Sequence, residues 1–82
     1  MITVEIFSRS GCHLCEVAES VVKEVQKEIA FQMTVTLIDG NSDLEAKFGE
    51  EVPVTFINGE RHDYFHVSRE RFIAALESAS FK

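Results

Sequence analysis

The chain is short of several residue types, and each shortage narrows what the protein can be. It has only two cysteines among 82 residues, so it lacks the several bridges that stabilise small secreted scaffolds. No apolar stretch is long enough to span a membrane, and residues 1–7 are too short for the core of a signal peptide. Eight basic residues against fourteen acidic ones give a net charge of −6, which argues against a nucleic-acid partner. We therefore expect one small cytoplasmic domain.

The two cysteines, Cys12 and Cys15, are the most informative feature of the chain. They follow a strand-like start and precede a helix-like run. On the first turn of a helix, residues three apart share one face, and the free N–H groups there favour a thiolate over a thiol. A bridge closing a loop of about four residues stabilises a fold by only about 2 kcal/mol, so a purely structural bridge is the weaker alternative. The spacing predicts a redox pair.

Hydrophobic periodicity predicts the elements of the first half of the chain. Residues 2–6 alternate between apolar and polar side chains, which predicts a strand, and the β-branched residues 33–38 predict a second strand. Between them, apolar residues at helical spacing predict a long amphipathic helix. The stripe of this helix consists of Leu14, Ala18, Val21, Val22, Val25 and Ile29.

The segment after the second strand carries signals for a short helix. Ser42 and Glu45 fit a capping box, with Ser42 as the N-cap and Glu45 reaching back to its backbone. Gly49 is suited to end this helix in the left-handed conformation. We therefore expect a helix over residues 43–48.

The second half of the chain predicts a hairpin and a closing helix. Residues 52–57 form a third strand, Asn58-Gly59 is a strong hairpin turn signal, and residues 60–65 return as a polar edge strand. Ser68 can cap the final helix, and Tyr64 and Phe65 need only be core or half-buried residues. The apolar positions of that helix are Phe72, Ile73, Leu76 and Ala79.

The element order β-α-β-α-β-β-α predicts an α/β fold in a single domain over residues 1–82. A strand, helix and strand in succession imply a parallel pair with a right-handed crossover. The hairpin then completes a four-stranded mixed sheet flanked by helices. Cys12 and Cys15 fall where the first strand feeds the first helix, and open α/β sheets place their sites at such carboxyl ends of strands.

On these residues the chain resembles the thioredoxin superfamily, and most closely a compact group of glutaredoxin-like proteins with a Cys-His-Leu-Cys centre. The resemblance rests on the strand–Cys12-x-x-Cys15–helix unit and on Val52-Pro53-Val54 at the superfamily's cis-proline position. Asp39 at the end of the second strand and Phe48-Gly49 before the third support it. It implies a thioredoxin/glutaredoxin-like fold and a thiol–disulfide oxidoreductase. We expect a monomer that needs no bound cofactor and takes electrons from a reductase or a low-molecular-weight thiol.

The resemblance also implies roles for individual residues. Cys12 would be the nucleophile that attacks a substrate disulfide, and Cys15 would resolve the mixed disulfide. A cis bond before Pro53 would expose the backbone of Val52 to an extended substrate chain. His13 either stabilises the thiolate when protonated or is simply an exposed residue of the first turn.

Arg9 and the acidic residues near the third strand bear on the substrate. Arg9 either stabilises the thiolate, binds a substrate carboxylate, or is a solvated loop residue. Glutathione-using glutaredoxins have a glycine pair after the last strand, whereas residues 65–68 contain no glycine. Glu50 and Glu51 would also bring negative charge to the groove. We therefore expect glutathione to be a poorer direct substrate than a protein disulfide.

Two other kinds of function remain open from the sequence. One is a zinc or iron–sulfur module in which His13, His62 and His66 join Cys12 and Cys15, although a structural zinc site usually takes four ligands in two close-spaced pairs. The other is a non-catalytic domain that binds a protein through the groove at Val52. Metal content after purification would identify the first, and failure to turn over a disulfide would identify the second.

Overall fold

A computed structural model describes residues 2–64 and 68–79. The elements appear in the predicted order β-α-β-α-β-β-α, and the fold is of the α/β class. None of the described helices is long and apolar enough to cross a membrane. The elements are β1 (Thr3–Ser8), α1 (His13–Gln26), β2 (Gln32–Leu37), α2 (Ser42–Phe48), β3 (Val54–Ile57), β4 (Glu60–Tyr64) and α3 (Arg69–Ala79).

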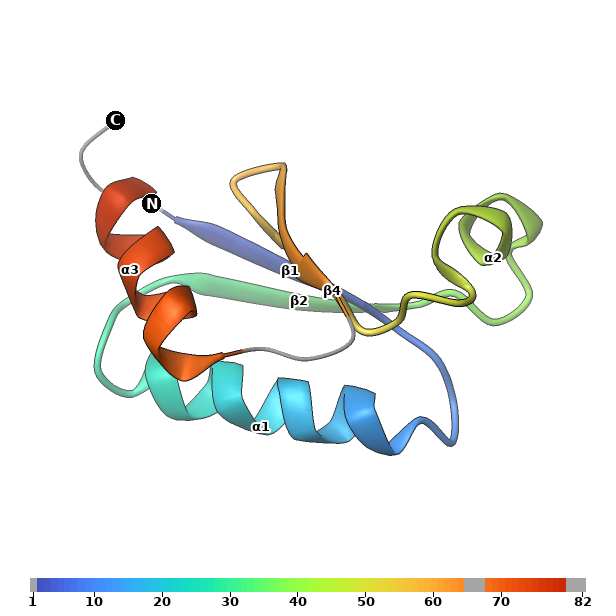
Figure 1. Ribbon diagram of the computed structural model, residues 1–82, viewed down its shortest axis with the longest axis horizontal. Coiled ribbons are helices and arrows are strands. Elements are labelled where there is room, and N and C mark those ends of the chain that lie inside the picture. Colours follow the sequence, from blue (N-terminus) through green and yellow to red (C-terminus); the bar gives the residue numbers. More distant parts are fainter. Residues whose placement is uncertain (1, 65–67, 80–82) are drawn as a thin grey trace.

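The four strands form one mixed sheet in the order β2-β1-β3-β4 (Figure 1). β1 and β2 are parallel, as a strand–helix–strand unit requires, and Ser8 lies opposite Leu37 at their carboxyl ends. β3 pairs antiparallel with both β1 and β4, and the ladder shifts register between Thr55 and Phe56. The predictions of a mixed sheet and of a polar edge strand at β4 are confirmed.

α1 and α3 pack on one face of the sheet and enclose what we call the main core. β1 contributes to it because Val4 and Ile6 alternate with residues of the other face. Phe72 of α3 is fully buried, and its ring meets that of Phe31 edge-on at 5.8 Å. The buried members of the main core are Val4, Ile6, Ala18, Val22, Val25, Phe31, Ile57, Phe72 and Leu76.

The buried stripe of α1 differs from the predicted one at both ends. It runs through Cys15, Ala18, Val22 and Val25, so Leu14 lies to one side of it and is 51% exposed. The prediction that Leu14 is a core residue is therefore wrong. At the other end the helix stops at Gln26, and Ile29 packs against the main core from the turn that follows.

α2 ends at Phe48 with Gly49 after it, as predicted, but its N-cap and the conformation of Gly49 differ from the prediction. Asn41, not Ser42, is the N-cap, because the turn after β2 leaves Asn41 extended with its side chain accepting the Leu44 amide at 3.1 Å. Gly49 is right-handed, with φ −53°, rather than left-handed. A Cβ on Gly49 would lie 2.4 Å from the Glu45 carbonyl oxygen, so close approach of the backbone explains the glycine here.

Strand bounds differ from prediction by a few residues. β1 continues to Ser8, and β3 starts only at Val54. The later start of β3 follows because Pro53 has no amide hydrogen to donate and the Val52 amide donates to the Phe48 carbonyl at 3.0 Å. The predicted cap of α3 is confirmed, since the Ser68 hydroxyl accepts the Arg71 amide at 3.5 Å. Phe65 and the side chain of Tyr64 lie outside the described part of the chain.

A second hydrophobic cluster lies at the carboxyl end of β1, where the first turn of α1 meets α2 and the start of β3. α2 lies at this end of the sheet, away from α3 (Figure 1). The Phe48 ring stacks on the Phe7 ring with centroids 4.7 Å apart, which attaches α2 to the sheet. We call the buried set the site cluster: Cys15, Ile38, Phe48, Val52 and Val54.

Candidate redox site

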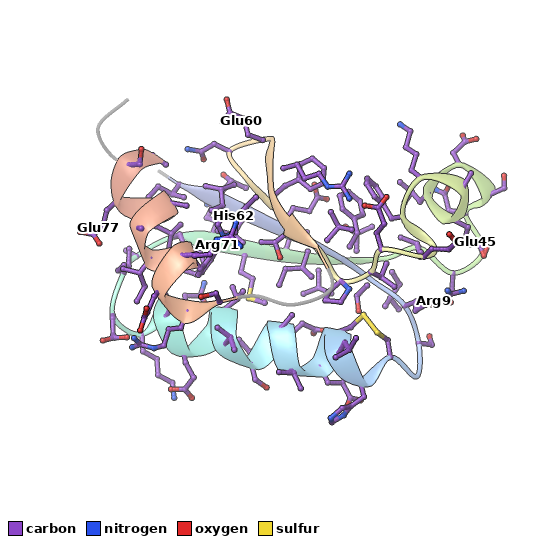
Figure 2. All side chains as sticks on the ribbon, in the orientation of Figure 1. Arg9, Glu45, Glu60, His62, Arg71 and Glu77 are labelled. Atoms are coloured by element: carbon purple, nitrogen blue, oxygen red, sulfur yellow. A yellow bond between two sulfur atoms is a disulfide. The ribbon has the colours of Figure 1, made fainter. Side chains whose placement is uncertain are left out.

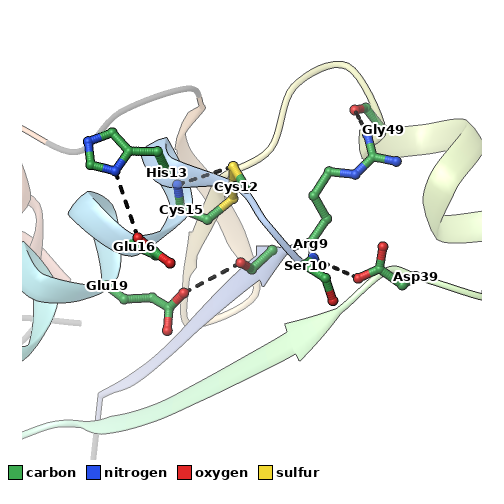
Figure 3. Close-up of a disulfide and its surroundings, with 10 residues drawn as sticks. Arg9, Ser10, Cys12, His13, Cys15, Glu16, Glu19, Asp39 and Gly49 are labelled. Atoms are coloured by element: carbon green, nitrogen blue, oxygen red, sulfur yellow. Dashed lines mark hydrogen bonds and ion pairs between the residues drawn. A yellow bond between two sulfur atoms is a disulfide. The ribbon is translucent and has the colours of Figure 1, made fainter.

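Cys12 is the N-cap of α1, and its sulfur occupies the position that a capping oxygen usually takes. Its backbone is extended, with φ −94° and ψ 107°, and its Sγ accepts the Cys15 backbone N–H at 3.2 Å (Figure 3). The unpaired amides and the partial positive charge of a helix N-terminus act at this point. The placement therefore favours negative charge on the sulfur of Cys12 when the pair is reduced.

Cys12 and Cys15 form a disulfide in the structure, with Cα atoms 5.2 Å apart. The two sulfurs have different surroundings. Cys15 is 1% exposed and belongs to the site cluster, whereas Cys12 is only half-buried and packs against the edge of that cluster. An incoming molecule can therefore reach Cys12 far more easily than Cys15.

The loop that carries Cys12 is attached to the end of β2 through Asp39. The Ser10 backbone N–H donates to Asp39 Oδ2 at 2.8 Å (Figure 3). This hydrogen bond is the main cause that holds the pKa of the Asp39 carboxyl below its usual value, and the nearby Arg9 charge acts in the same direction. Asp39 is thus a carboxylate that anchors the backbone just before the cysteines.

Arg9 reaches across to α2 instead of toward the sulfurs. Its Nη1 donates to the Gly49 carbonyl at 2.9 Å, just beyond the carboxyl end of α2 (Figure 3). A guanidinium at the end of a helix also interacts favourably with the helix dipole. Arg9 therefore joins the cysteine loop to the segment that leads into Pro53. Its roles toward the thiolate or a substrate carboxylate stay predictions.

His13 lies on the outer side of the first turn of α1. Its side chain is 86% exposed, and its Nδ1 lies 3.7 Å from Glu16 Oε2. One turn further along, Glu19 accepts a hydrogen bond of 3.4 Å from the hydroxyl of Ser8, which is buried at the end of β1. In this disulfide state the contact of His13 is thus with a carboxylate on its own helix.

Val52 belongs to the site cluster together with Cys15, and Pro53 follows it directly. The Val52–Pro53 peptide bond is cis, which is the isomer that the resemblance implies. Pro53 is fully buried and Val52 is 8% exposed. Because the Val52 amide already donates to the Phe48 carbonyl, an extended chain at this position would have to use the Val52 carbonyl or displace that bond.

The structure does not bring His62 to the cysteines. His62 lies beside α3, with its ring centroid 5.8 Å from that of Phe72, far along the molecule from Arg9 and the disulfide (Figure 2). His66 lies outside the described residues. Within residues 2–64 and 68–79, no group of three or more His, Cys, Asp or Glu side chains is placed to hold a metal ion.

The acidic pair ahead of Val52 is divided between two environments. Glu51 forms an ion pair with Arg61, whose guanidinium also lies 6.0 Å from the centre of the Phe48 ring. Glu50 is exposed. Arg61 therefore offsets the charge of Glu51.

The anchoring contacts of Asp39 and Arg9 were missed in the sequence. One signal for Asp39 exists in principle, because parallel pairing of Ser8 with Leu37 places the residues two positions further, Ser10 and Asp39, side by side. That register is not readable from periodicity alone. No sequence signal identifies Gly49 as the acceptor for Arg9, since this contact depends on how α2 packs.

Comparisons with known proteins agree with this geometry. The family model of the glutaredoxin-like domain (DUF836) matches residues 3–77. An uncharacterized protein of Mycobacterium tuberculosis is 31% identical over an alignment of 83 positions, which covers 95% of this chain and 86% of that protein. Among solved structures, protein Ne2328 from Nitrosomonas europaea is 28% identical with a TM-score of 0.78, covering 90% of this chain and 89% of its own.

Thioredoxins share the fold at lower identity. Thioredoxin-2 of the malaria parasite superimposes with a TM-score of 0.74 at 22% identity, over 95% of this chain and 82% of that one. The architecture is therefore that of the thioredoxin fold, with a Cys-x-x-Cys pair at the start of α1. The chain belongs to the family of glutaredoxin-like domains.

Proposed function

We propose that the protein is a thiol–disulfide oxidoreductase that cycles between the Cys12/Cys15 dithiol and its disulfide. The observation that carries this proposal is the sulfur of Cys12 at the N-cap of α1, accepting the Cys15 amide at 3.2 Å. This position stabilises a thiolate, which is the reactive form of cysteine. The burial of Cys15 supports the division of roles between the two residues.

The reaction proceeds through two exchanges. The Cys12 thiolate attacks one sulfur of a substrate disulfide, that bond breaks, and the departing substrate thiolate takes up a proton. Cys15 then loses its proton, and its thiolate attacks Cys12 Sγ in the mixed disulfide. The second substrate thiolate leaves and is protonated, so the substrate gains two electrons and the Cys12–Cys15 pair loses two.

Regeneration requires a donor of two electrons. A reductase or a low-molecular-weight thiol returns the disulfide to the dithiol by the same exchange chemistry, and no bound cofactor is needed. The reducing cytoplasm, which we expect from the sequence, supplies both kinds of donor. We propose that the protein acts there as a monomer.

We further propose that protein disulfides are better substrates than glutathione mixed disulfides. The exposed carboxylate of Glu50 and the absence of a glycine pair in residues 65–68 support this. The contribution of Glu51 is weaker than the sequence implies, because Arg61 is its ion-pair partner. Comparing reduction rates for insulin and for a small glutathione mixed disulfide tests it, and efficient turnover of the glutathione substrate would refute it.

The decisive test compares the two single cysteine variants. Cys12→Ser should lower the rate of disulfide reduction by about 10³-fold or more, the scale expected when a nucleophile is removed. Cys15→Ser keeps the nucleophile but lacks the resolving thiol, so it should accumulate mixed disulfides with partner proteins in cell extract. If Cys15→Ser stays folded and forms no such adducts, the dithiol mechanism is wrong. Metal that co-purifies with the parent in a Cys12-dependent way would favour a metal module instead.

A further inference from the structure

We propose, taking the proposed function as given, that Asp39 is a positioning residue that holds the sulfur of Cys12 at the N-terminus of α1. Only residues 9–11 separate the end of β1 from Cys12. All three are exposed, and Gly11 turns the chain with φ +72°. So short and exposed a segment depends on specific contacts for its conformation.

Contacts of Ser10 and Arg9 fix this segment, and Figure 3 shows both residues. The Asp39 carboxylate accepts the Ser10 amide at 2.8 Å, and Arg9 donates to the Gly49 carbonyl at 2.9 Å. Asp39 directly follows Ile38, which is fully buried in the site cluster, so the carboxylate is attached to a rigid part of the fold. The Asp39 contact binds the backbone itself, two residues before the N-cap.

This contact matters most in the reduced protein. While the disulfide is present, the bond to Cys15 holds the Cys12 sulfur in place. After reduction, the sulfur is held by its hydrogen bond with the Cys15 amide, by the packing of Cys12 at the edge of the site cluster and by the backbone of residues 9–12. Loss of the Asp39 anchor would let Cys12 move away from the helix end, where the stabilisation of the thiolate falls off within the first turn.

The charge of Asp39 acts on Cys12 in the opposite direction from its hydrogen bond. A carboxylate near a thiolate disfavours the ionised sulfur, so removing the charge alone should make Cys12 more reactive. Removing the hydrogen-bond acceptor should make Cys12 less reactive. The signs of the two effects therefore separate positioning from simple electrostatics.

The test measures iodoacetamide alkylation of Cys12 in the reduced protein against pH. Asp39→Asn retains an oxygen for the Ser10 amide and should alkylate at the parental rate or faster. Asp39→Ala has no acceptor and should alkylate about twofold to fivefold more slowly at neutral pH, with its pH profile moved upward. Asp43→Ala removes a carboxylate from α2 without touching Ser10, and it should not slow the reaction.

A second measurement reports on the anchor directly and needs no activity. In the reduced parent, hydrogen exchange of the Ser10 amide should be protected, and Asp39→Ala should remove that protection while the amides of β1 keep theirs. If Asp39→Ala alkylates as fast as Asp39→Asn, or if the Ser10 amide is unprotected in the reduced parent, Asp39 does not position Cys12. Alkylation and exchange do not require substrate turnover, so this result stands apart from failure of the oxidoreductase assays.

Discussion

The main core and the site cluster differ in size, in position and in whether they contain a cysteine. Within residues 2–64 and 68–79, the main core joins α1 and α3 to the sheet through nine buried residues, none of which is a cysteine. Among the described residues, the site cluster has five buried members, with Cys15 contributed by the first turn of α1 and Phe48 by the short helix α2. Most of the packing that stabilises the fold thus lies away from the residues proposed to react.

This separation suggests that stability and reactivity can be changed one at a time. A cavity in the main core removes buried apolar contacts but leaves the N-cap geometry of Cys12 unchanged. A cavity in the site cluster disturbs the support of Cys15, and of Ile38 just before Asp39. Substitutions matched between the two regions therefore test whether the division is real.

The largest effect on stability is expected from Phe72→Ala. Phe72 is fully buried between Phe31 and His62, with ring centroids 5.8 Å from each. Truncation of a buried phenylalanine costs about 3–5 kcal/mol. Urea denaturation should show this loss, while the alkylation rate of Cys12 in the folded, reduced protein should match that of the parent. A changed alkylation rate in folded protein would show that the main core and the site are coupled.

Reduction of the disulfide should have a smaller effect. The bridge closes a loop of about four residues, so its removal should lower the free energy of unfolding by about 2 kcal/mol. Denaturation curves of the oxidised and reduced forms measure the difference, with Cys12→Ser/Cys15→Ser as the control that cannot form the bridge. A much larger difference would mean that the bridge also organises the site cluster.

The sequence predicted the main core better than the site cluster, for a physical reason. Alternation in β1 and the 3.6-residue period of α1 and α3 report which face of each element is buried, and they identified Val4, Ile6, Val22, Phe72 and Leu76. The cysteine pair was evident because its chemistry depends on local spacing. The fold class followed from the element order.

The contacts around the site depend on tertiary placement, which periodicity does not contain. The bond from Ser10 to Asp39 requires the parallel register of β1 and β2, and the bond from Arg9 to Gly49 requires the docking of α2. The exposure of Leu14 is a similar case, because Cys15 takes the buried position of that turn. The predicted N-cap of α2 was wrong for a local reason. Asn41 and Ser42 are adjacent, and both are good N-cap residues.

A matched pair of isoleucine substitutions should give small and equal losses of stability. Ile6 in the main core and Ile38 in the site cluster are both fully buried. Each change to valine should cost about 0.5–1.5 kcal/mol. Only Ile38→Val should also change the reactivity of the cysteine pair, measured as its reduction potential against a glutathione buffer. If the reduction potential shifts equally in both variants, or in neither, the site cluster does not affect the cysteine pair more than the main core does.

The smallest effect concerns the pH dependence of the Asp39 anchor. The Ser10 amide lowers the pKa of Asp39 in the folded protein, so its contribution to stability is present above the unfolded pKa, near 3.8. That contribution is lost as the pH falls through the lower folded pKa. The parent should therefore be more stable than Asp39→Asn at pH values above about 4, and this difference in stability should shrink as the pH falls below that range. Urea denaturation at stepped pH measures the difference, with Asp43→Asn as a control of equal net charge. A difference in the free energy of unfolding that grows on acidification would contradict the predicted direction. It would mean that the Asp39 carboxylate does not stabilise the fold through Ser10.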